Sequence, residues 1–131
     1  MIGLDTTILL RLWLDDDPAQ SRRIDALLAE FGTAPGSLLV CDVVLAEAVW
    51  TLASAFDQNK AAQLKALHSL LSEAAFAFES RDAVARAVAQ FERSTCGFSD
   101  CLIAAKHELL ACEFTATFDK GMRRLSSVRV L

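Results

Sequence analysis

The stretch from Leu38 to Trp50, LLVCDVVLAEAVW, decides the fold class of this chain. It opens with a short apolar run of strand length, and from Val43 the chain continues to Phe56 with almost no polar residue, which is too long for a strand. We therefore expect a strand that leads directly into a buried helix. One acid, Glu47, lies a full turn inside that helix, where a buried charge needs a partner or an opening to water.

The rest of the chain repeats this alternation of short apolar segments and helix-like segments. Strands are expected at residues 1–4, 76–78, 113–117 and 128–131, and helices at 7–14, 19–31, 60–72, 80–94, 100–110 and 120–125. Such alternation is typical of a parallel sheet covered by helices on both faces. The sequence thus predicts an α/β fold with a mainly parallel central sheet of four to five short strands, and its 131 residues predict a single domain, 1–131.

Composition argues against several classes of protein. The formal net charge of −4 argues against nucleic-acid binding by bulk electrostatics, so any such role has to be local. No apolar run approaches the roughly 18–20 residues of a membrane span, and the first residues carry no signal-peptide pattern, so we expect a cytoplasmic protein. The four cysteines form no Cys-x-x-Cys pair and the two histidines have no ligand spacing, which favours free thiols over a zinc site.

Four acids stand in apolar surroundings: Asp5, Glu47, Asp100 and Asp119. Each aspartate among them also stands before a possible helix and could be an N-cap, which is the preferred interpretation of Asp42. The carboxyl ends of parallel strands share one edge of a sheet, so the four carboxylates meet there if the helices of Glu47 and Asp100 begin at that edge. Oxygen ligands without His or Cys suit Mg²⁺ or Mn²⁺ rather than zinc.

Four segments resemble the successive acidic motifs of PIN-domain proteins, especially the VapC-type toxins of type II toxin–antitoxin systems. They are Asp5-Thr6, Leu45–Ala48, Phe98–Ala105 and Thr115–Lys120, and they follow the family's order over almost the whole chain. The resemblance implies a PIN-like three-layer α/β/α sandwich and an endoribonuclease that depends on Mg²⁺ or Mn²⁺. It also implies a homodimer that a cognate antitoxin protein neutralises.

Carried over residue by residue, the resemblance assigns roles to particular side chains. Those that fall on the family's catalytic and metal-binding acids are Asp5, Glu47, Asp100 and Asp119, while Thr6 and Thr117 fall where hydroxyl residues support the site. Asp42 departs from the pattern, because a small polar residue is more usual there. The helices expected at 19–31 and 60–72 are candidates for the groove that holds an antitoxin helix.

Basic and aromatic residues carry weaker indications. Lys120, Arg123, Arg124 and, less strongly, Arg11 are candidates for contacts with RNA phosphates, although a solvated basic face explains them equally well. Base stacking by aromatic side chains is conceivable, but their placement favours core packing, and Trp50 is expected in the core.

The chemistry implied is hydrolysis of an RNA phosphodiester, with metal bound mainly by Asp5, Asp100 and Asp119. Glu47 could bind the metal, hold a water molecule or transfer a proton, and a DNA substrate also stays open. Two other classes remain. A non-catalytic scaffold that binds RNA or protein would be expected to have lost some of these carboxylates, and a receiver-like phosphotransfer domain would carry an adjacent acidic pair beside Asp5.

Overall fold

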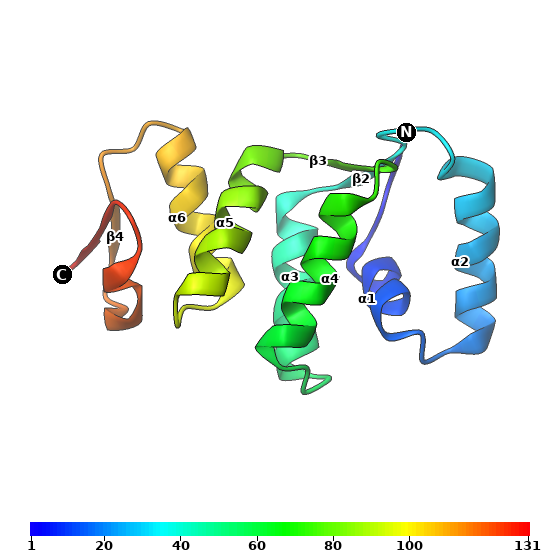
Figure 1. Cartoon of the computed structure of the whole chain (residues 1–131), viewed down its shortest axis with the longest axis horizontal. Coiled ribbons are helices and arrows are strands. Elements are labelled where there is room, and N and C mark those ends of the chain that lie inside the picture. The colour runs from blue at the N-terminus through cyan, green and yellow to red at the C-terminus, as the bar shows by residue number, and fades with distance from the viewer. The chain divides into compact units, whose positions relative to one another are not determined.

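The computed structural model describes residues 1–131, and the chain divides into two compact units, Met1–Glu79 and Ser80–Leu131. The first unit contains β1 (Ile2–Gly3), α1 (Thr6–Leu14), α2 (Pro18–Phe31), β2 (Leu38–Val40), α3 (Asp42–Ser54), α4 (Lys60–Ser72) and β3 (Phe76–Phe78) (Figure 1). The second contains α5 (Arg81–Arg93), α6 (Phe98–Leu109), β4 (Thr115–Thr117), the 3-10 helix η1 (Lys120–Arg124) and β5 (Val128–Val130).

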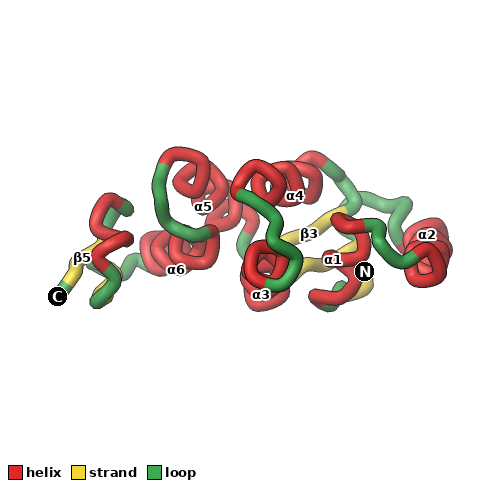
Figure 2. Tube along the Cα trace, turned by 90° about the horizontal axis from the view of Figure 1, so that it is seen from below, coloured by secondary structure: helices red, strands yellow, loops and turns green.

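The first unit is built on a parallel sheet in the order β1-β2-β3. Ile2 lies opposite Leu38, and Leu38 lies opposite Phe76, so the three strands end at the same edge. Figure 2 shows the strands between α4 on one side and α1 with α3 on the other. This arrangement confirms the predicted α/β class with helices on both faces of parallel strands.

Helix α3 has one buried face and one exposed face. The buried residues recur every three or four positions, as a period of 3.6 requires, and they are Leu45, Ala48, Val49 and Leu52. Val43, Glu47 and Trp50 lie on the opposite face, and Trp50 is 65% exposed. The helix was predicted correctly, but it is buried on one face only, and the expected placement of Trp50 in the core was wrong.

The core of the first unit joins α1, α3 and α4. Leu10, Leu52 and Ala66 form a buried cluster, with the partly buried side chains Trp13 and Phe56 packed against it. Each of the three helices contributes one residue to this cluster, and such packing supplies most of the stability of helices in proteins. This packing holds α1, which begins directly after Asp5, against α3, which carries Glu47.

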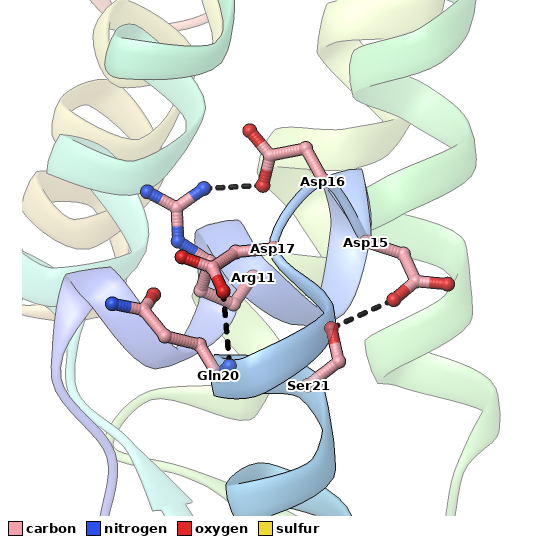
Figure 3. Close-up of polar contacts among 6 residues, drawn as sticks. All are labelled: Arg11, Asp15, Asp16, Asp17, Gln20 and Ser21. Atoms are coloured by element: carbon pink, nitrogen blue, oxygen red, sulfur yellow. Dashed lines mark hydrogen bonds and ion pairs between the residues drawn. The ribbon is translucent and has the colours of Figure 1, made fainter.

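The turn between α1 and α2 is held by polar contacts of three consecutive acids, Asp15, Asp16 and Asp17 (Figure 3). Asp17 caps α2 by accepting a hydrogen bond from the Gln20 backbone N–H at 3.0 Å. Ser21 Oγ donates to Asp15 Oδ1 at 2.7 Å, and Arg11 forms an ion pair with Asp16. The separation between the helices expected at 7–14 and 19–31 is confirmed, and these acids stabilise the turn between them.

The second unit packs α5 against α6. Phe91 of α5 and Phe98 of α6 meet edge to face, with ring centroids 6.1 Å apart. Beyond α6, β4 pairs in parallel with β5, and Thr115 lies opposite Val128. The Arg129 guanidinium lies over the Phe114 ring, 3.7 Å from its centroid.

All five predicted strands are present and every pairing is parallel, but their hydrogen bonds form two sheets, of three and two strands. Each strand is only two or three residues long, and β5 follows β4 after the short η1, so the pairing of these two strands is local in sequence. No helix has the length and apolar character needed to cross a lipid bilayer.

Candidate carboxylate site

Asp5 lies at the carboxyl edge of the first unit's sheet, just beyond β1. It occupies the N-cap position of α1, yet its side chain makes no cap hydrogen bond and is exposed. Its one contact is long, from Thr7 Oγ1 to Oδ2 at 3.4 Å. Thr6, the proposed supporting residue, is buried as the first residue of α1. The Asp5 carboxylate therefore forms no cap hydrogen bond. It lies at a helix N-terminus, where the helix dipole favours negative charge.

Glu47 lies in the second turn of α3 on that helix's exposed face. The sequence required either a partner or an opening to water for this acid, and the structure provides the opening to water. Because α3 packs against α1 and begins directly after β2, Glu47 and Asp5 are carried by neighbouring helices that start at the same edge of the sheet.

Glu79 is an acid at this edge that the sequence interpretation missed. It directly follows β3, and its Oε1 accepts a hydrogen bond from the backbone N–H of Asp42 at 2.9 Å. Cys41 holds the N-cap position of α3 without a side-chain bond, so the prediction that Asp42 is the cap was wrong. Glu79, which follows β3, thus accepts a hydrogen bond from a backbone N–H group in the first turn of α3. The sequence signal for Glu79 was its position directly after a strand, which it shares with Asp5.

The second unit carries the other two acids. Asp100 lies in the first turn of α6 and is partly buried. Asp119 is the N-cap of η1, and its Oδ1 accepts a hydrogen bond from the Gly121 N–H at 2.8 Å. The Asp119 N–H in turn donates to Thr117 Oγ1 at 3.0 Å. For Asp119 the cap interpretation is therefore correct, and Thr117 orders the turn that presents it.

Asp100 and Asp119 interact electrostatically. Burial raises the pKa of the Asp100 carboxyl above its ordinary value, and the negative charge of Asp119 raises it further. Holding both carboxylates ionised therefore costs free energy, and a cation bound beside them would offset that cost. In neither unit, however, do three or more His, Cys, Asp or Glu side chains form a group arranged to hold a metal ion.

The exposed side chains near Asp119 include three cations and one aromatic ring. Lys120, Arg123 and Arg124 place three cationic side chains on η1, as predicted for a basic segment. Phe118, directly before Asp119, is 81% exposed, so it does not belong to the core that most aromatic residues were expected to fill. Arg11, the weaker candidate for phosphate contact, is engaged by Asp16 in the turn after α1.

Comparison with known proteins gives one match. The sequence model of the PIN-domain family matches residues 2–128, a range that includes all four predicted acids. No curated protein and no solved structure matches the chain. Together with the parallel α/β architecture, the match over nearly the whole length shows that this chain belongs to the PIN-domain family, whose members are generally nucleases and often depend on a metal ion.

Proposed function

We propose that this chain is an endoribonuclease that depends on Mg²⁺ or Mn²⁺, and that it is the toxin of a toxin–antitoxin pair. The observation that carries the proposal is the Asp100–Asp119 pair, in which burial and then the negative charge of Asp119 raise the pKa of the Asp100 carboxyl, in a chain of a nuclease family. Such a pair is unfavourable for folding alone and useful where a divalent cation binds.

The donor set fits a hard cation. The proposed metal ligands and catalytic acids are Asp5, Glu47, Asp100 and Asp119, an assignment that follows the order of the acidic motifs along the chain. Carboxylate oxygens without nitrogen or sulfur ligands are what Mg²⁺ and Mn²⁺ prefer. When bound, the ion supplies Lewis-acid stabilisation of the charge that develops on the phosphate.

The protein's own groups would position the substrate and move protons. The Gly121 N–H holds one oxygen of Asp119, which orients the carboxylate before any ligand arrives. Glu47 is open to water and is suited either to contact the ion or to accept a proton from the attacking water. Lys120, Arg123 and Arg124 are proposed to contact backbone phosphates, and the exposed Phe118 offers a ring on which a base can stack.

Partner binding is proposed on the helices of the first unit. A cavity of about 470 Å³ lies between α1 and α2, lined by apolar side chains such as Ile24 and Leu27 and by Arg11 and Arg23. Its mixed lining supports α2 as the antitoxin surface, with α4 as the second candidate. The exposed Trp50 on α3 supports a homodimer. We further propose that residues 1–131 act as a single PIN-like domain in the cytoplasm.

The test is RNA cleavage by the purified protein with Mn²⁺ or Mg²⁺, with EDTA and the Asp5→Asn variant as negative controls. Asp25→Asn, a change at an exposed acid of α2, is the matched control and should cleave as the wild type does. Metal-dependent cleavage that Asp5→Asn abolishes supports the proposal. Equal cleavage by Asp5→Asn would point to a contaminating nuclease.

The alternative that the sequence leaves open is a non-catalytic scaffold that binds RNA or protein. Inactivity on structured RNAs and on single-stranded DNA, together with no Mn²⁺ binding by calorimetry, would establish that alternative. Cleavage of DNA in preference to RNA would retain the metal site and change the substrate.

A further inference from the structure

The second unit contains a small cavity with a cationic rim. It has a volume of about 210 Å³ and lies between α5, α6 and the Leu125–Ser126 segment after η1. Its floor is apolar, formed by residues such as Ala104 and Ala105 of α6. A cavity of this size is below the roughly 300–1,000 Å³ of sites for drug-sized ligands, so it suits a small group of a larger ligand.

The rim is built mainly from one face of α5. Arg86, Gln90 and Arg93 recur at intervals of four and three residues, so all three project from the same side of the helix. Ser126, in the segment after η1, adds a hydroxyl to the lining. Two guanidinium groups, an amide and a hydroxyl form a set of donors suited to the oxygens of an anion.

One acid, Glu108, also lines the cavity and opposes anion binding. Its Oε2 lies 3.5 Å from Arg86 Nη1, longer than the roughly 2.7–2.9 Å of a tight charge-assisted hydrogen bond. The pair is therefore loose, and the Arg86 side chain is 56% exposed. Arg93 uses only its Nε–H, which donates to the Ala89 carbonyl at 3.3 Å. The charged groups at the rim sum to +1, in a chain whose formal net charge is −4.

We infer that this cavity binds a backbone phosphate of the RNA substrate, outside the carboxylate site. The inference rests on the proposed function. Two features favour RNA over an acidic protein segment. The cavity wall includes Cys101, the residue after Asp100, and its Leu125–Ser126 side directly follows the basic η1. A single-stranded RNA that lies along η1 beside Asp100 therefore has a further phosphate contact within the same unit.

The test measures binding apart from cleavage. A labelled single-stranded RNA is titrated with the full-length protein in EDTA, and fluorescence anisotropy gives the dissociation constant at several salt concentrations. Arg86→Gln and Arg93→Gln are each expected to weaken binding about two- to fivefold, as for partly exposed charge pairs. Loss of one phosphate contact should also lower the slope of log affinity against log salt by about 0.7.

Two further variants make the result specific to the cavity. Glu108→Gln removes the opposing charge and should tighten binding about two- to fivefold. Arg81→Gln removes a charge of the same sign from the same helix but outside the cavity, and it should bind as the wild type does. Circular dichroism establishes that each variant is folded.

Several outcomes would overturn the inference. They are wild-type affinity in both Arg86→Gln and Arg93→Gln, an equal loss in Arg81→Gln, or displacement of the RNA by poly-glutamate at equal charge, which would assign the cavity to an acidic protein. Failure of the proposed function looks different, because a wild-type protein without metal-dependent cleavage can still show the binding pattern of the cavity.

Discussion

Replacing Asp119 separates its structural role from its proposed catalytic role. In Asp119→Ala the Gly121 N–H loses its acceptor at 2.8 Å, and loss of an N-cap costs about 1 kcal/mol. For a chain of this length that lowers the melting temperature by about 3–5 °C. Asp119→Asn keeps an acceptor oxygen at the same position, so its stability should stay within about 0.5 kcal/mol of the wild type.

Activity should respond differently from stability. Asn is neutral and a poor ligand for a hard cation, so both variants should lose about a hundredfold or more in metal-dependent cleavage. The assays are thermal unfolding followed by circular dichroism and cleavage of a labelled RNA with Mn²⁺. Asp119→Asn that unfolds as early as Asp119→Ala would refute the cap argument, and Asp119→Asn with undiminished cleavage would refute the catalytic assignment.

Three more predictions test other parts of the structure. Because the pKa of Asp100 is raised in the folded protein, its charge costs stability at neutral pH, and the cost disappears as the pH falls through the raised pKa. Asp100→Asn should therefore melt at a higher temperature than the wild type at pH 7. Below the ordinary pKa of an aspartate the two proteins should melt at the same temperature. Addition of Mn²⁺ should raise the melting temperature of the wild type only. Trp50→Ser on the exposed face of α3 should change the free energy of unfolding by less than about 0.5 kcal/mol in urea denaturation. Leu52→Ala on the buried face should cost about 2–5 kcal/mol in the same assay. Equal costs for the two variants would contradict a helix with one buried and one exposed face. Glu79→Ala removes the acceptor for the Asp42 N–H and should cost about 1 kcal/mol in the same assay, so an unchanged denaturation midpoint would show that water replaces this bond.

The helices and strands were predictable because each depends on a local pattern. Three-residue apolar runs such as Phe76–Phe78 became strands, and segments with a period near 3.6 became helices. Which face of an apolar helix is buried is a different question, since it depends on what packs against it. In α3 the sequence is apolar around most of its circumference, so nothing local indicated that Trp50 would be exposed.

The candidate site was predictable only in part. Asp5 stood out because it follows a strand and precedes a helix, and the structure leaves its carboxylate free of capping. The same placement led to opposite outcomes elsewhere, since Asp119 does cap η1 and Asp42 does not cap α3. A cap depends on backbone angles and on competing acceptors, and for α3 the competitor is Glu79, 37 positions away in sequence.

The charge distribution is compatible with the proposal that this acidic chain acts on a polyanion. With a net charge of −4, the protein gains little from long-range attraction to RNA, so phosphate binding depends on local cations. The second unit concentrates them, with three basic residues on η1 and two arginines at the rim of the cavity beside α5. In the proposed nuclease, the negative charge of the Asp100–Asp119 pair would oppose RNA binding until a divalent ion neutralises it. The same two carboxylates would thus make productive RNA binding conditional on the metal, because without the ion their charge repels the phosphate that the basic residues attract.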